Sequence, residues 1–217
     1  MILLFANGDL PDNRWLAPLW AQATAVIGVD GGTHHILHAG QTPTMMIGDF
    51  DSIEPALLAK LTAQGIPTRR YSAAKDETDL ELALHVVIEE PAWQDEEIWI
   101  VGVVGGRLDQ TLANILLLAH PDLTQRTVKL VTQHQAAWLI TQQSTIQGKA
   151  GDIVSLIPLG GDVKIDYTTN LRWNLQNELL RFGPARGVSN ELTATTAEIY
   201  LKSGQLLCIH SAHDWNR

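Results

Sequence analysis

The sequence predicts an α/β domain with a parallel sheet, followed by an antiparallel β-sandwich. In residues 1–140, short apolar runs alternate with stretches of helical periodicity, which is typical of a doubly wound fold. Several runs are almost continuously apolar, as expected for parallel strands that are buried on both faces. Beyond residue 140 the apolar spacing shortens towards two, and glycine-rich turns separate the segments. We therefore expect two domains, 1–140 and 141–217.

The same patterns predict the individual elements. The strands expected in the first domain are 2–6, 25–30, 44–49, 97–106 and 127–133. The helices expected between them are 53–64, 76–90 and 108–119. The strand segments expected in the second domain are 151–159, 162–169, 191–202 and 204–210.

Composition narrows the class of protein. The net charge of −9 argues against sequence-independent nucleic-acid binding, and a polyphosphate ligand would need an accompanying cation. The single cysteine, Cys208, lies in the apolar run "QLLCIH" and fits a small core residue better than a nucleophile. A single thiol allows no intrachain disulfide, and no apolar run approaches the ~20 residues of a membrane span. We expect a cytoplasmic protein that does not bind membranes.

Aspartates follow two neighbouring predicted strands. Asp30 ends "AVIGVD" before two glycines, which would let the backbone approach a ligand closely, and Asp49 ends "TMMIGD". Asp51 follows before a helix that Ser52 is expected to cap. Any one of these acids could be a turn or capping residue. Ligands of open α/β sheets gather beyond the carboxyl ends of the strands, so several acids at this edge favour a site.

The segment "KDETDLELALHVVI" adds two more acids. Helical spacing places Asp76 and Asp79 on or beside the apolar stripe that includes Leu80 and Leu84, so both should face the sheet edge. An acidic first helical turn explains exposed acids well but inward-facing acids poorly. Carboxylates gathered in one cleft repel one another unless a cation lies among them, and Mg²⁺ takes carboxylate and phosphate oxygens.

The segment "VVGGRLDQTLANILLLA" carries a positive charge. Arg107 follows two glycines at a strand-to-helix turn, where backbone amides and a guanidinium suit a phosphate group. Asp109 and Gln110 could cap the helix, orient metal-bound water or hold Arg107. Lys75 adds a movable positive charge beside Asp76.

Five short motifs, in this order along the chain, resemble the thiamine pyrophosphokinase family: "DGG" (30–32), "GDFDS" (48–52), "KDETD" (75–79), "GGRLDQ" (105–110) and "GVSNEL" (187–192). The resemblance spans nearly the whole chain. It implies an ATP-dependent transferase, thiamine diphosphokinase, which moves pyrophosphate from ATP to the thiamine hydroxyl and releases thiamine diphosphate and AMP. It also implies a Rossmann-like catalytic domain, a β-sandwich that helps to bind thiamine, and a homodimer whose active sites use both chains.

The resemblance also assigns roles to residues. The implied metal ligands, for Mg²⁺, are Asp49, Asp51, Asp76 and Asp79. The implied ATP contacts are Asp30, Lys75, Arg107 and Gln110, and the implied thiamine contacts are Ser189 and Asn190. The groups expected to take part in catalysis are Asp51, Asp76, Asp79, Arg107 and Asp109. Transfer of this kind depends largely on positioning and charge stabilisation.

Two alternatives come from other classes of protein. "DFDSI" also resembles the D-x-D motif of aspartyl-phosphate phosphohydrolases, but here it follows the third predicted strand and leaves "GGRLDQ" unexplained. A non-catalytic nucleotide or thiamine sensor would not need acids in every motif.

The spacing of His34 and His38 allows a metal pair, although a solvated helix face explains it more simply. Trp173 could stack on a ligand ring or fill the sandwich core.

Overall fold

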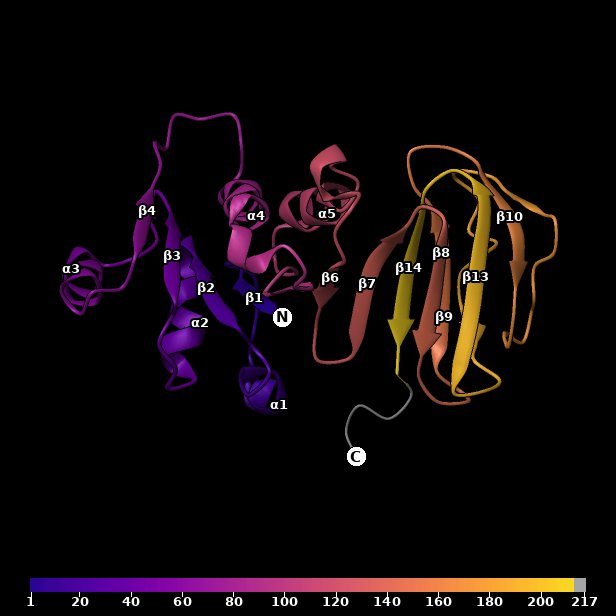
Figure 1. The fold of residues 1–217 in the computed structure, drawn as a ribbon, viewed down its shortest axis with the longest axis horizontal. Helices are drawn as coiled ribbons and strands as arrows, with labels where there is room; N and C mark the ends of the chain where they lie inside the picture. Colours follow the sequence, from indigo (N-terminus) through magenta and orange to yellow (C-terminus); the bar gives the residue numbers. More distant parts are fainter. Residues whose placement is uncertain (213–217) are drawn as a thin grey trace. The chain divides into compact units, whose positions relative to one another are not determined.

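The computed structural model describes residues 1–212, and the chain divides into two compact units (Figure 1). The first unit comprises Met1–Thr132 and the second Gln133–Arg217, whereas the sequence pattern placed the change of character at residue 140. Residues 213–217, which include His213 of the C-terminal tail, lie outside the described residues.

The first unit contains a parallel sheet with the strand order β6-β5-β1-β2-β3-β4. Its strands are β1 (Ile2–Phe5), β2 (Ala25–Val29), β3 (Met45–Gly48), β4 (Thr68–Arg70), β5 (Ile98–Val101) and β6 (Val128–Val131). All four residues of β1 are fully buried, so both faces of the central strand are covered, as the continuous apolar run predicted. The pattern missed β4 because this short edge strand is polar and mostly exposed.

Helices connect these strands. They are α1 (Ala17–Trp20), α2 (Thr33–His38), α3 (Pro55–Ala63), α4 (Asp79–Glu89) and α5 (Leu108–Leu117). Four short 3-10 helices accompany them: η1 (Arg14–Leu16), η2 (Asp30–Gly32), η3 (Pro91–Trp93) and η4 (Pro121–Leu123). Leu3 and Phe5 of β1 pack with Leu16 and with Ile36 of α2 in one apolar cluster. A second cluster joins Met46 of β3 to α3 and its flanking turns.

Two helix starts differ from the prediction. Helix α4 begins at Asp79, because the Thr78 hydroxyl accepts a hydrogen bond from the Glu81 amide at 3.2 Å and caps the first turn. Asp76 precedes the helix, so its predicted position on the apolar stripe is wrong. Helix α3 begins at Pro55 rather than next to Ser52. The Ser52 hydroxyl donates to the Asp51 carboxylate at 3.0 Å instead of capping the helix.

The second unit consists of antiparallel strands in the orders β12-β9-β14-β7 and β11-β10-β13-β8. The strands are β7 (Gln135–Ile140), β8 (Gln143–Gln147), β9 (Ile153–Pro158), β10 (Val163–Thr168), β11 (Leu179–Leu180), β12 (Asn190–Glu191), β13 (Thr196–Ser203) and β14 (Leu206–Ser211). Inward-facing residues of both groups of strands form one apolar core. The predicted β-sandwich is therefore confirmed.

Burial within the sandwich explains what the sequence pattern found and missed. Along β9, buried and half-buried residues alternate, which is the spacing of two that predicted a strand. Only Ile140 of β7 is buried, so that strand carries a weak signal. Cys208 is fully buried in the core, as predicted, and burial raises the pKa of its thiol well above the usual range. In the described part of the chain, no helix has the length and apolar character needed to cross a membrane.

Candidate active site

A cleft of about 540 Å³ lies at the carboxyl edge of the parallel sheet, entirely within the first unit. Its lining comes from residues 6–9 after β1, 29–30 at the end of β2, 102–107 after β5, residues 73, 75 and 77–80 before and at the start of α4, and residues 110, 111 and 114 of α5. Strand β1 pairs with β2 on one side and with β5 on the other, so the strand order reverses here. Open α/β sheets bind ligands at such a reversal point.

Three carboxylates meet in this region. One oxygen from each of Asp30, Asp49 and Asp79 lies within 4.8 Å of the other two. Asp30 is only 7% exposed, and its Oδ1 is buried without a hydrogen-bond partner among the described residues. The Asp30 φ of +46° is in the left-handed region, which Asp tolerates better than most residues. A buried acceptor without a partner calls for a ligand or ion to complete it.

Lys75 supplies the positive charge beside this acid cluster. Its Nζ contacts Asp79 Oδ1 and lies 4.0 Å from Asp49 Oδ2. One ammonium against three carboxylates leaves an excess of negative charge, which a hard divalent cation would offset. All the donor atoms of the acid cluster are carboxylate oxygens, the ligands that Mg²⁺ prefers. The residues present therefore fit this ion.

Two of the predicted metal ligands lie outside the acid cluster. Asp51 is exposed, and its backbone amide donates to Asp49 Oδ1 at 3.1 Å. Phe50, between them, has a φ of +63° and is buried in the apolar cluster under α3, which anchors the turn. Asp76 is exposed in the segment before α4. Thus the structure brings Asp49 and Asp79 together with Asp30, which the sequence had linked to ATP.

Arg107 and Asp109 form an exposed pair at the start of α5. The Arg107 Nε and Nη2 atoms donate to the two Asp109 oxygens at 2.8 and 2.5 Å. These hydrogen bonds lower the pKa of Asp109 to about 2, so its carboxylate stays charged. Of the roles considered for Asp109, holding Arg107 is the one that the structure displays. Arg107 and Gln110 both line the cleft.

Close backbone packing shapes the cleft floor. A Cβ on Gly32 would lie 1.8 Å from the Phe5 carbonyl oxygen, so this glycine allows close contact with β1. The close approach to a ligand expected for the two glycines after Asp30 stays a prediction. Gly102 has a φ of +69°, and a Cβ there would lie 2.3 Å from the Ala6 carbonyl oxygen. Both glycines bring loops of the cleft close together.

Two residues that support these loops escaped the sequence analysis. His35 Nε2 donates to the Gly8 carbonyl at 2.8 Å, and burial lowers the pKa of this histidine, which favours the neutral ring. Asn114 Nδ2 donates to the Val103 carbonyl at 2.9 Å. His35 lies between His34 and His38, whose spacing drew attention instead. His34 and His38 belong to no metal-binding group within the described residues.

In the second unit, Asn190 supports an exposed indole. Its Oδ1 accepts from the Trp173 and Glu191 amides at 3.1 and 2.9 Å, and its Nδ2 donates to the Trp173 carbonyl at 2.8 Å. Trp173 is 56% exposed, so the suggestion that it fills the sandwich core is wrong. The Arg172 guanidinium lies 5.0 Å from the indole centroid. Ser189, with a φ of +62°, donates its amide to Ser155 Oγ at 3.1 Å.

The fold and the cleft define a class of protein: an α/β unit with an acid-lined, ligand-sized crevice, followed by a β-sandwich. Two family models match this arrangement. "Thiamin pyrophosphokinase, catalytic domain" matches residues 16–131, and "Thiamin pyrophosphokinase, vitamin B1 binding domain" matches residues 140–206. The chain belongs to the thiamine pyrophosphokinase family.

Individual relatives agree with this assignment. The thiamine pyrophosphokinase of Bacillus subtilis is 31% identical over 190 residues, with 87% of each chain covered. Its counterpart from Caenorhabditis elegans is 26% identical over 200 residues, covering 87% of this chain and 79% of that one. The crystal structure of the B. subtilis protein superposes with a TM-score of 0.86 at 28% identity, over 98% of this chain and 99% of the other.

Proposed function

We propose that this chain transfers pyrophosphate from ATP to the hydroxyl of thiamine and releases thiamine diphosphate and AMP. Thiamine pyrophosphorylation follows from membership of the family, and the chain is an enzyme. The phosphohydrolase and sensor alternatives are not favoured. A cytoplasmic location, expected from the single cysteine, is part of the same proposal.

One observation supports the catalytic centre most directly: three carboxylates converge at this sheet edge, two of them, Asp30 and Asp79, in the lining of the cleft. The buried Asp30 Oδ1 has no partner within residues 1–212. In this proposal Asp30, Asp49 and Asp79 hold Mg²⁺. When bound, the ion neutralises phosphate charge and helps to orient the transferred group. Asp51 and Asp76 lie outside the acid cluster, so we assign them to contacts around ATP or metal-bound water.

The positive side chains then act on the phosphates. Lys75, held beside Asp49 and Asp79, is placed to offset the charge that develops during transfer. Arg107 enters the cleft from the start of α5, and Gln110 follows it one turn into the same helix. Asp109, with a pKa of about 2, is a weak base and is better suited to orienting Arg107 than to accepting the thiamine proton.

Thiamine is assigned to the second unit, within the proposed domain 141–217. Thiamine carries a quaternary ring, and an exposed tryptophan is a favourable surface for such a cation. The Asn190 side chain already makes three hydrogen bonds, so its role would be to position Trp173. Ser189 has a backbone amide held by Ser155 and would present its hydroxyl to the ligand. We further propose a homodimer in which each site uses both chains.

Incubation with ATP, Mg²⁺ and thiamine, with AMP and thiamine diphosphate both quantified, tests the activity. The proposal expects equal amounts of the two products. It also expects no AMP when thiamine is omitted, and loss of both products with EDTA that excess Mg²⁺ reverses. Inorganic phosphate release without thiamine would indicate the phosphohydrolase instead, and binding without turnover would indicate the sensor.

A mixing experiment tests the shared site separately. Asp49→Asn and Ser189→Ala should each inactivate the homodimer. Unfolding and reassembling an equal mixture gives mixed dimers in half of the population, each with one intact site, so roughly a quarter of all sites should recover. A mixture no more active than its parents would confine each site to one chain, without affecting the assigned reaction.

A further inference from the structure

We propose a second metal site, selective for a divalent transition metal such as Zn²⁺, outside the cleft of the first unit. Its ligands are Glu81 and His85 of α4 and His120, which follows α5. One ligand atom from each of these residues lies within 4.8 Å of the other two. Two imidazoles and a carboxylate form a donor set typical of zinc sites, and a fourth position remains for water.

Local structure brings the three side chains together. Glu81 and His85 are separated by one helical turn, so they lie on the same face of α4. His120 precedes the 3-10 helix η4, and its ring meets the His85 ring edge-on, with centroids 5.2 Å apart. His120 Nε2 is 3.9 Å from Glu81 Oε1. Tetrahedral ligands at about 2.0–2.1 Å from Zn²⁺ lie about 3.3–3.4 Å apart. The Glu81–His120 pair would therefore have to close by about 0.5 Å, and a pair at the 4.8 Å limit by about 1.5 Å.

Without an ion, one ring nitrogen of this group has no hydrogen-bond partner in the described part of the chain. His85 Nε2 is buried and has no hydrogen-bond partner among residues 1–212. A hollow of about 360 Å³, lined in part by Glu81 and His120, adjoins the group. The side chains of Glu81, His85 and His120 are between 26% and 34% exposed, which leaves access for an ion and a water ligand.

Asp122 is placed to orient the two histidine ligands. One of its carboxylate oxygens lies 3.8 Å from His85 Nε2 and 4.0 Å from His120 Nδ1. In the structure, His120 Nδ1 accepts a hydrogen bond from the Asp122 amide at 3.3 Å. When His120 Nε2 binds a metal, the proton of the neutral ring moves to Nδ1, so the hydrogen bond from the Asp122 amide is given up and Nδ1 can donate to the Asp122 carboxylate, now 4.0 Å away, instead. Metal-bound histidines are commonly oriented by a carboxylate in this way.

The two groups of ligands should select different ions because their donor atoms differ. The acid cluster of Asp30, Asp49 and Asp79 offers only carboxylate oxygens, whereas Glu81, His85 and His120 offer two ring nitrogens and one carboxylate. Imidazole ligands suit zinc and its neighbours, while an all-oxygen set suits Mg²⁺. A filled zinc site would join α4, which begins with Asp79, to the end of α5, which begins next to Arg107. Two helices that carry cleft residues would thereby be fastened to each other.

Metal titration of the chelator-treated protein tests the proposal. Zn²⁺ is titrated calorimetrically in excess Mg²⁺, and Co²⁺ serves as an optical probe because nitrogen ligands and four-coordination give it intense visible absorption. We expect one site per chain of this kind. His120→Ala and Glu81→Gln should each weaken Zn²⁺ binding more than about 100-fold, and Asp122→Asn roughly tenfold, the usual effect of losing an outer partner.

His38→Ala is the matched control, since it removes a helical histidine from a pair with the same spacing as Glu81 and His85. It should leave affinity and the cobalt spectrum unchanged. Thermal unfolding of each variant without metal verifies folding, and added Zn²⁺ should raise the Tm of the unaltered protein but not that of His120→Ala. Equal zinc affinity in the unaltered protein and in His120→Ala or Glu81→Gln would overturn the proposal. So would a cobalt spectrum without nitrogen ligation.

Discussion

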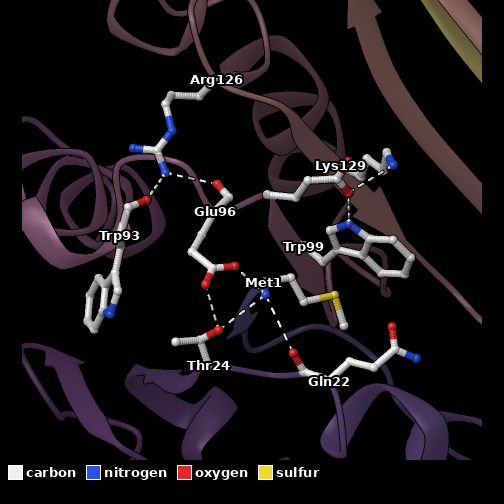
Figure 2. A network of polar contacts seen from close by, with 9 residues as sticks. Met1, Gln22, Thr24, Trp93, Glu96, Trp99, Arg126 and Lys129 are labelled. Atoms are coloured by element: carbon white, nitrogen blue, oxygen red, sulfur yellow. Dashed lines mark hydrogen bonds and ion pairs between the residues drawn. The ribbon is translucent and has the colours of Figure 1, made fainter.

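The two ends of the parallel sheet differ in how far their carboxylates are paired with positive charges. At the end where the strands begin, Glu96 and Glu97 each contact their own partners, and Figure 2 shows the network around Glu96. The Glu96 carboxylate forms an ion pair with the Met1 ammonium at 2.5 Å and accepts a hydrogen bond from the Thr24 hydroxyl at 2.7 Å. Arg126 Nη2 donates to the Trp93 and Glu96 carbonyls at 2.6 and 3.0 Å, which joins the turn before β5 to the start of β6.

At the end where the strands finish, three carboxylates share one ammonium. Asp30, Asp49 and Asp79 converge, and Lys75 contacts only two of them. Like charges at this separation oppose folding, whereas paired charges at the other end do not. An arrangement that weakens the free protein but suits a cation and a polyphosphate indicates a binding site. The opposite end stabilises the fold.

The largest effect should come from Asp79→Asn, at the end that carries the site. Loss of one ligand should lower kcat/KM roughly 100-fold or more, because metal-ion stabilisation of developing charge contributes several kcal/mol. The urea midpoint should stay level or rise, since repulsion within the acid cluster falls as the Lys75 contact is lost. Asp51→Asn, outside the acid cluster, should cost less activity than Asp79→Asn. Asp95→Asn, at an exposed acid elsewhere, serves as the control.

The activities of Asp79→Asn and Asp51→Asn can contradict the assignment of the metal site to this end of the sheet. If Asp79→Asn kept near-normal activity, or if Asp51→Asn were the more damaging variant, the grouping of Asp30, Asp49 and Asp79 would not describe the working metal site. Steady-state assays across a range of Mg²⁺ concentrations distinguish weaker metal binding, which excess Mg²⁺ offsets, from a defect that it does not.

The next largest effect concerns the other end of the sheet. Arg126→Ala removes donors from two carbonyls, so we expect a loss of about 1.5–3 kcal/mol in the free energy of unfolding. Activity per folded molecule should not change. Urea unfolding measures the first quantity, and an assay corrected for the folded fraction measures the second. Arg69→Ala, at an exposed arginine of β4, is the control, and a specific activity loss in Arg126→Ala would contradict the proposed division of roles.

A smaller effect should appear on mild acidification. Burial lowers the pKa of His35 below the ordinary value of 6.5, so the folded protein prefers the neutral ring. Its contribution is complete above about pH 6.5 and is lost as the pH falls towards the lowered folded pKa. His35→Gln keeps a donor near Gly8 without this titration. The free energy of unfolding should therefore fall less steeply in His35→Gln than in the unaltered protein, and equal slopes would exclude this contribution.

The smallest effect should appear at lower pH and at the opposite end. Hydrogen bonds from the Met1 ammonium and the Thr24 hydroxyl lower the pKa of Glu96 below the ordinary value of 4.5. The stabilisation is complete above about pH 4.5 and is lost as the pH falls through the lowered pKa. The stability difference between the unaltered protein and Glu96→Gln should therefore shrink below that pH. Glu89→Gln, at an exposed acid, should show no such convergence.

The sequence by itself determined the fold class and predicted that acids gather at one edge of the parallel sheet. Continuous apolar runs predict buried parallel strands, and a spacing of two predicts the sandwich strands, because burial on two faces or on one leaves these patterns locally. Asp30 and Asp49 could be placed at one sheet edge for the same reason. The five ordered motifs added the family, which the comparisons support along both units.

Only the tertiary structure decided which side chains meet. The Thr78 cap starts α4 at Asp79, which puts Asp79 among the acids and leaves Asp76 outside, although both share one motif. His35 reaches the Gly8 carbonyl, and His120 meets Glu81, across segments far apart along the chain. Local patterns report which face of an element is buried. Contacts between distant segments depend on helix starts, strand order and loop paths, which arise only when the whole chain packs.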